Sequence, residues 1–259
     1  MTSALASRIP LLSVDFHKVT EAEVVAHVVA AIGRGEGGRI ITPNADILRL
    51  ATRQQEARDH IRDSTLVVAD GMPLLWASKL SGTPLPERVA GSSLILTLSA
   101  GLAEQGRRVY LLGGEPGTAE QAADELERRF PGLVVAGWHS PSFGFDTRPD
   151  EVAQMQELVV AAKPDLVYVG LGFPKQERVI AGLRPLLPAA WFLGCGAAIG
   201  FAAGTLRRAP VWMQRTGLEW LHRLGSEPRR LAKRYLVHDA PFAARLLASS
   251  ARTRLSRRR

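Results

Sequence analysis

The sequence predicts an α/β fold, in which a mostly parallel sheet carries helices on both faces and a basic helical appendage follows at the C-terminus. Two patterns support this prediction. Short, nearly continuous apolar runs alternate with longer stretches of helical period, which is typical of strands that are covered on both faces. The second pattern is a change of composition after Gly204, where arginines become frequent.

The predicted elements follow one another in regular alternation along the first 200 or so residues. The predicted strands are Arg39–Thr42, Leu66–Ala69, Val109–Leu112, Leu133–Ala136, Leu166–Gly170 and Trp191–Leu193. The predicted helices between them are Asp46–Ile61, Ser92–Gln105, Thr118–Phe130, Glu151–Ala162 and Lys175–Leu183. Right-handed crossovers place the loops that follow these strands at one edge of the sheet, where open α/β sheets bind ligands.

Two amphipathic helices are expected in the basic C-terminal region, one over 210–224 and one over about 228–238. The aromatic and apolar side chains of the first either pack against the core or lie in a membrane interface; these are Trp212, Met213 and Trp220. We therefore divide the chain into a catalytic α/β body (1–203), a basic amphipathic appendage (204–240) and a basic tail (241–259) that we expect to be disordered.

Composition limits the class of protein. The 259 residues are 46% hydrophobic and 22% charged, which is ordinary globular usage and excludes a disordered or fibrous protein. Cys195 is the single cysteine, which excludes an internal disulfide framework and favours a reducing compartment. Neither a signal peptide nor an apolar run of membrane-spanning length is present, so we expect a cytoplasmic protein.

The charge is unevenly distributed. The formal net charge is +8, yet the region from Gly204 onward alone carries 13 Arg and one Lys against three acidic residues. The body is therefore mildly acidic, and the basic region calls for an anionic partner such as a phosphate-bearing ligand, an acidic membrane surface or a nucleic acid.

Polar and glycine residues follow five of the predicted strands, which predicts a ligand cleft at that edge. Asp70 follows an apolar strand and is either a general base or the N-cap of a helix over 72–80. The run Gly113–Thr118 is either a tight turn or a set of backbone amides that contact a diphosphate or a sugar. The histidines show no metal-ligand spacing and no Asp-x-Asp pair is present, so we expect no metal.

Five strings of residues, in order over about 12–236, make the chain similar to one family. They are Ile41-Thr42-Pro43-Asn44, Ala69-Asp70-Gly71-Met72-Pro73, Pro86-Glu87-Arg88-Val89-Ala90-Gly91, Gly170-Leu171-Gly172-Phe173-Pro174-Lys175-Gln176-Glu177 and the run from Arg208 to Trp220 (RAPVWMQRTGLEW). The chain resembles the WecG/TagA/CpsF glycosyltransferases, glycosyltransferase family 26. This resemblance implies a Rossmann-like body with a C-terminal membrane-binding appendage.

The resemblance also implies an activity. Members invert the sugar as they transfer it from a nucleotide-diphosphate sugar, usually a UDP-sugar such as UDP-N-acetylmannosamine, to a sugar on a polyprenyl-diphosphate lipid at the inner face of the cell membrane. They serve teichoic acid, capsule and exopolysaccharide synthesis. We therefore expect a peripheral membrane protein that uses the UDP-sugar as substrate, has no cofactor, binds no nucleic acid and is either a monomer or a homo-oligomer.

The resemblance assigns roles to individual residues. The catalytic base falls on Asp70, with Thr42, Asn44 and Gln176 as further active-site residues. The appendage arginines fall on Arg223, Arg230 and Arg234, with Lys233 as a rival for the last. Backbone and cationic contacts to the nucleotide sugar are expected from Gly113, Gly114, Gly172, Gly196 and Arg88.

Two departures from the family pattern keep other functions open. The family commonly has aspartate where this chain has Gly200 and Ser93, which puts nucleotide or sugar contacts and donor choice in doubt. A catalytically idle scaffold of a polysaccharide complex is therefore one alternative. A protein that binds nucleic acid through its basic tail is another, although the sequence shows neither a recognition helix nor an aromatic platform.

Overall fold

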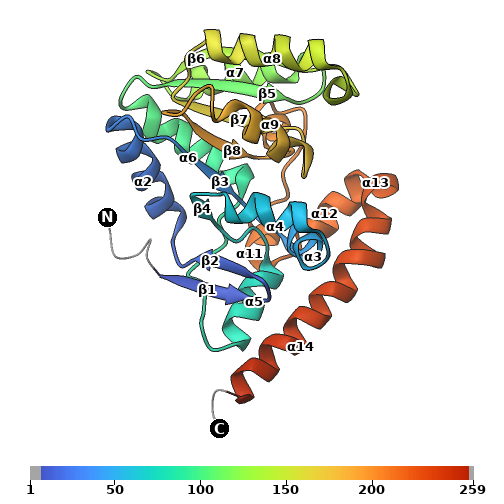
Figure 1. Cartoon of the computed structure of the whole chain (residues 1–259). Helices are drawn as coiled ribbons and strands as arrows, with labels where there is room; N and C mark the ends of the chain where they lie inside the picture. The colour runs from blue at the N-terminus through green and yellow to red at the C-terminus, as the bar shows by residue number, and fades with distance from the viewer. Residues whose placement is uncertain (1–6, 257–259) are drawn as a thin grey trace.

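The computed structural model describes residues 7–256, apart from the side chains of Arg215 and Arg230. Its centre is a six-stranded, all-parallel sheet in the order β4-β3-β8-β7-β5-β6, with helices on both faces (Figure 1). The strands are β3 (Gly38–Ile41), β4 (Leu66–Val67), β5 (Arg108–Gly113), β6 (Val134–His139), β7 (Leu166–Gly170) and β8 (Trp191–Gly194). The predicted fold class is thus confirmed.

The helices of the body follow the strands in alternation, with one short 3₁₀ turn, η1 (Phe145–Thr147). They are α2 (Glu21–Gly33), α3 (Ala45–Arg53), α4 (Gln55–Arg62), α5 (Met72–Leu80), α6 (Gly91–Ala103), α7 (Thr118–Arg129), α8 (Pro149–Ala161), α9 (Lys175–Leu183) and α10 (Ala198–Ala202). The C-terminal region forms α11 (Val211–Thr216), α12 (Glu219–Ser226), α13 (Pro228–Ala232), the π-helical η2 (Lys233–Asp239) and α14 (Ala240–Ser256).

Alternate residues of each strand point to opposite faces of the sheet, and each face has its own core. Ile40, Leu111 and Leu193 belong to the core that includes α2, α6, α7 and α10. On the other face, Leu112 and Phe192 belong to the core beneath α8 and α9. A third core lies under α3, α4 and α5. These cores hold the carboxyl ends of the strands in one fixed row.

An antiparallel hairpin, β1 (Arg8–Leu11) with β2 (Val14–His17), lies outside the main sheet. Our sequence analysis did not identify it, nor helix α2, whose N-terminus is closed by a capping box between Thr20 and Glu23. Two of the predicted helices are also interrupted. The segment 46–61 breaks at Gln54, and the segment 210–224 breaks at Gly217, which adopts a left-handed conformation (φ 82°).

The tail differs most from expectation. We expected 241–259 to be disordered, but as far as Ser256 the chain continues as helix α14, and the last three residues lie outside the described part. Leu246 of α14 is buried in the third core, and α14 runs along α5 (Figure 1). Apolar residues between the arginines form one face of this helix, and that face is buried. Our expectation of disorder rested on the number of charged residues and did not take this face into account.

Candidate functional site

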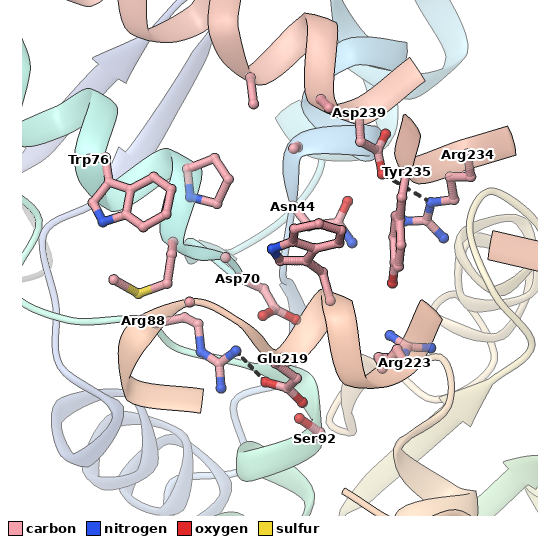
Figure 2. Close-up of a pocket in the computed structure, with 18 of the residues that line it drawn as sticks. Asn44, Asp70, Trp76, Arg88, Ser92, Glu219, Arg223, Arg234, Tyr235 and Asp239 are labelled. Atoms are coloured by element: carbon pink, nitrogen blue, oxygen red, sulfur yellow. Dashed lines mark hydrogen bonds and ion pairs between the residues drawn. The ribbon is translucent and has the colours of Figure 1, made fainter. Parts of the chain in front are cut away.

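A cleft of about 470 Å³ lies beyond the carboxyl ends of β3, β4 and β8. The body forms its floor through the loops after these strands, and the appendage closes it through α12, η2 and α14 (Figure 2). This is the edge of the sheet at which the sequence predicted a ligand site. Of the predicted site residues, the cleft gathers Asn44, Asp70, Arg88, Arg223 and Arg234.

Backbone pairing beyond the ends of the strands places three of these residues side by side. The amide of Asp70 donates to the Pro43 carbonyl at 3.0 Å, which sets Asp70 beside Asn44. The amide of Val89 donates to the Ala69 carbonyl at 2.9 Å, which brings Arg88 to the other side of Asp70. Segments that are far apart in the sequence thus meet through main-chain hydrogen bonds, independently of their side chains.

Asp70 does not cap the helix that follows it. Gly71 is the N-cap residue of α5, and no side chain caps the helix there. Burial raises the pKa of the Asp70 carboxyl from 3.8 to about 6; Arg88 lowers it and Glu219 raises it. A carboxyl group with a pKa near neutrality, at the mouth of a strand, suits a general base. Of the two roles that the sequence left open, the structure excludes the cap.

Arg88 is tied to the appendage. Its Nη1 donates to Glu219 Oε2 at 2.6 Å, and both side chains are largely shielded from solvent. Arg208 lies on the other carboxylate oxygen of Glu219 at 3.7 Å. Because Glu219 begins α12, this ion pair fixes the first turn of α12 next to Asp70. It also holds the Arg88 guanidinium where it faces the Asp70 carboxylate.

Two appendage arginines reach the cleft in different ways. The Arg223 guanidinium lies 6.0 Å from the centre of the Phe201 ring, a cation–π contact at the floor of the cleft. Arg234 pairs with two carboxylates, Asp46 of α3 at 3.0 Å and Asp239 at 3.4 Å. Arg234 therefore joins the appendage to the body. The side chain of Arg230, the third predicted arginine, lies outside the described part.

Asn44 is the N-cap of α3. Its Oδ1 accepts from the amides of Asp46 at 3.0 Å and Ile47 at 3.1 Å. The carbonyl oxygen of the side chain is thereby committed, which leaves the amide nitrogen as the group that can donate to a ligand. The cap also fixes the direction in which this nitrogen points.

Gln176 and Thr42 do not line the cleft in this structure. Gln176 is only 4% exposed and belongs to a buried polar chain. Its Oε1 accepts from the Gly196 amide at 3.1 Å, and its Nε2 donates to Glu177 Oε1 at 3.0 Å. Glu177 in turn accepts from Arg39 at 2.6 Å, and both of these charged side chains are fully buried. Thr42 is also buried, at the end of β3.

The predicted glycines occupy the neighbouring strand ends rather than the cleft wall. Gly113 has φ 117°, and a Cβ there would lie 2.5 Å from the carbonyl oxygen of Gly170, so it allows β5 and β7 to approach closely. The Gly114 amide donates to the same carbonyl at 3.3 Å, which commits it within the chain. Gly172 and Gly196 also have positive φ but have open space around them. The loop of Gly196 borders the cleft through Cys195 and Ala197.

The two departures from the family pattern lie close to the appendage. The hydroxyl of Ser93 accepts from Arg208 Nη2 at 2.9 Å. Gly200 is buried in α10, where a Cβ would meet Leu206 Cδ1 at 2.9 Å, so a larger residue would require this loop to shift. Cys195 is buried, and burial raises the pKa of its thiol to about 12, which is incompatible with a nucleophile at neutral pH.

Sequence reasoning missed several residues of the cleft. Glu219 lies in the fifth string of residues and in an expected amphipathic helix, but it was given no role, although it is the ion-pair partner of Arg88. Trp76, Tyr235 and Asp239 also line the cleft and carried no signal of their own. The partners Arg88 and Glu219 are 131 residues apart, and only the way the appendage packs on the body brings them together. In the described part of the chain, His, Cys, Asp and Glu form no cluster of three that could hold a metal ion.

Comparisons with known proteins give one consistent result. The model of the glycosyl transferase WecG/TagA/CpsF family matches residues 9–256. An N-acetylglucosaminyldiphosphoundecaprenol N-acetyl-beta-D-mannosaminyltransferase of Bacillus spizizenii is 30% identical over 222 residues, which are 85% of this chain and 84% of the relative. A protein of the same name from Staphylococcus aureus strain MRSA252 is 28% identical over 229 residues, or 88% of each chain.

Proposed function

Since the chain belongs to the WecG/TagA/CpsF family of glycosyltransferases, we propose that it transfers an N-acetylmannosamine-like sugar from a UDP-sugar to a sugar on a polyprenyl diphosphate. The relatives' names supply the acceptor and the transferred sugar. The observation that carries the proposal is the Asp70 carboxyl, whose pKa is raised to about 6 in a cleft at the strand ends.

We propose that Asp70 is the general base of an inverting displacement. The carboxylate takes the proton of the acceptor hydroxyl as the hydroxyl oxygen attacks the anomeric carbon. The bond from that carbon to the diphosphate breaks on the opposite side, and UDP leaves with the electron pair. The pKa of about 6 keeps Asp70 deprotonated at neutral pH while leaving it more basic than an exposed aspartate.

The departing diphosphate needs positive charge, and arginines of the cleft are placed to supply it. Arg223 faces the cleft from α12, and Arg234 faces it from η2 on the same side of Asp70 (Figure 2). A guanidinium donates two hydrogen bonds in a fixed fork, which matches phosphate oxygens. Donors of this kind contribute about 2.7–4 kcal/mol each to a transition state. We therefore propose that transfer proceeds without a metal ion.

The acceptor would reach the cleft from a membrane surface. In the described residues no helix has the length and apolar character needed to cross a bilayer. The appendage instead exposes apolar side chains among its arginines, with Val211 at 61% and Trp212 at 59% exposure. We propose that this surface holds the enzyme on the anionic inner face of the membrane.

The test is a transfer assay with UDP-N-acetylmannosamine and N-acetylglucosaminyl-diphosphoundecaprenol. The wild-type enzyme should form a product of inverted anomeric configuration, undiminished by EDTA. Asp70→Asn should lower kcat by about 10²–10⁴-fold and leave donor affinity unchanged, because only the proton acceptor is lost. Asp124→Asn, an exposed carboxyl group on α7, is the matched control. Absence of transfer by the folded wild type would favour the scaffold alternative.

A further inference from the structure

The cleft that holds Asp70 has a second, apolar part that the sugar-transfer chemistry does not use. Asp70, Arg88 and Glu219 occupy the centre of the whole cleft, and Arg223 and Arg234 lie to one side of them (Figure 2). Trp76 of α5 lies on the other side in this view. Its indole lines the cleft and is 41% exposed, although it is one of the largest apolar side chains in the protein.

Helices α5 and α14 form the two walls of this apolar part. From α5 come Met72, Pro73 and Trp76. From α14 come residues spaced so that they share one helix face, namely Ala240, Ala243, Ala244 and Leu247. On the neighbouring face of α14, Leu246 and Ser250 are buried where this helix packs on α5. The apolar part opens toward Asp70, and the partial exposure of Trp76 leaves it open to solvent along one side.

The turn between α11 and α12 closes the apolar part from a third side. A Cβ on Gly217 would lie 2.9 Å from Met72 Cβ and 3.1 Å from Trp76 Cζ2, so the turn packs directly on α5. The appendage therefore does more than cover the polar centre. It also builds an apolar wall that is continuous with the arginines.

We propose that this apolar part is a subsite for the first isoprene units of the acceptor lipid. This inference rests on the proposed function. It places the diphosphate of the acceptor beside Arg88, and it leaves Arg223, on the other side of Asp70 from Trp76, for the diphosphate of the donor (Figure 2). A prenyl diphosphate is an apolar chain joined directly to a dianionic head. The cleft has the same order, with apolar walls on α5 and α14 next to the Arg88 guanidinium. The enzyme thereby binds the lipid at its diphosphate end, while the rest of the isoprenoid chain stays in the membrane.

The subsite gives the enzyme a means of selecting its acceptor. A nucleotide sugar has no apolar chain, so only the acceptor gains affinity from the walls of α5 and α14. Each isoprene unit that enters should tighten binding by about tenfold or more, because five carbons leave water. Chain length beyond the walls should add nothing.

The experiment measures binding by calorimetry, below the micelle concentration, for inorganic diphosphate and for dimethylallyl, geranyl and farnesyl diphosphate. Binding should tighten with each isoprene unit in the wild type. Ala244→Trp places a large side chain in the apolar part and should remove this dependence on length while leaving the affinity for inorganic diphosphate. Ala248→Trp makes the same change one turn along α14, outside the cleft, and should bind like the wild type.

Three results would overturn the inference. One is a wild-type affinity that does not change with prenyl length. The second is an equal effect of Ala244→Trp and Ala248→Trp. The third is equal binding of a saturated dodecyl diphosphate, which would indicate a general lipid surface. Trp76→Ala, which removes the opposite wall, gives a second route should Ala244→Trp fold poorly. Length-dependent binding without sugar transfer would instead overturn the proposed function alone.

Discussion

The sheet body and the appendage stabilise their folds in different ways. Four of the five residues of β7 are buried, whereas α12 has no buried residue. The body closes around three apolar cores, while the appendage is held by ion pairs such as Arg88–Glu219 and Arg234–Asp46 and by the packing of α14 on α5. The comparison teaches that the body provides a rigid floor, and that the appendage leaves apolar side chains such as Val211 and Trp212 exposed.

The largest expected effect concerns the interior of the body. Glu177→Ala should lower the free energy of unfolding by about 3–5 kcal/mol, because it removes the fully buried partner of the Arg39 guanidinium and leaves it with the largely exposed Asp63. Removal of a surface partner should cost far less. Glu125→Ala breaks an exposed pair with Arg128 on α7 and should cost under about 1 kcal/mol.

Urea unfolding of both variants checks this prediction. Similar losses for Glu177→Ala and Glu125→Ala would contradict the view that the body depends on its buried ion pair. Glu177→Ala also removes the acceptor of the Gln176 side-chain amide, which in turn accepts from the Gly196 amide.

A smaller effect of opposite sign is expected in the cleft. Because burial raises the pKa of Asp70 from 3.8 to about 6, the folded state binds more protons than the unfolded state between these values. Stability from this group is therefore present at low pH and lost as pH rises through about 6. Asp70→Asn should raise the free energy of unfolding on the order of 1–3 kcal/mol at pH 7.5.

The gain should shrink as pH falls from 6 to 4 and vanish below about pH 3, where Asp70 is protonated in both states. Thermal or chemical unfolding at pH 7.5 and at about pH 3 measures both values. If Asp70→Asn is instead less stable than the wild type at pH 7.5, the Asp70 carboxylate is stabilised by its surroundings, contrary to its raised pKa.

The smallest effect on stability, but a clear effect on binding, is expected on the outer face of the appendage. Replacing Val211 and Trp212 by serine should weaken binding to vesicles of anionic phospholipid by about tenfold or more, since these exposed side chains would lose their contact with the bilayer. Stability should change by less than about 0.5 kcal/mol, as for other exposed sites. Leu158→Ser, an equally apolar exposed position on α8, is the control and should leave vesicle binding intact. Unchanged vesicle binding by the double variant would contradict the proposal that the appendage binds the membrane.

The strands and helices of the body were easier to predict from the sequence than those of the appendage, for a physical reason. Strands covered on both faces are continuous apolar runs, so β5, β7 and β8 were visible as such. The hairpin β1–β2 is only eight residues of paired strand with mixed polarity, and its pattern was not distinct. In α14, arginines on the exposed side masked the apolar face that packs on α5.

The same distinction applies to the site. Asp70 was identifiable as a candidate because it is a carboxylate directly after an apolar strand, although that pattern fits a general base and a helix cap equally, and the resemblance assigned the base. The pairing of Arg88 with Glu219 was not identifiable, because it depends on how α12 docks. Gln176 was assigned to the active site by resemblance alone, and the structure places it in a buried network beside the cleft. The local sequence pattern thus predicts which residues lie at the strand ends. Which side chains of the appendage face them depends on tertiary packing, which the pattern does not contain.

The most direct test of the account is the pH dependence of kcat/KM for sugar transfer, since this quantity reports the essential base of the free enzyme. The acid limb should have its midpoint near pH 6, the pKa of Asp70. In Arg88→Ala the limb should move to higher pH, because the cation that lowers the pKa of Asp70 is gone and Glu219 is left with the longer ion pair to Arg208. A limb near pH 4, or one that stays in place in Arg88→Ala, would contradict the assignment of Asp70 as the base.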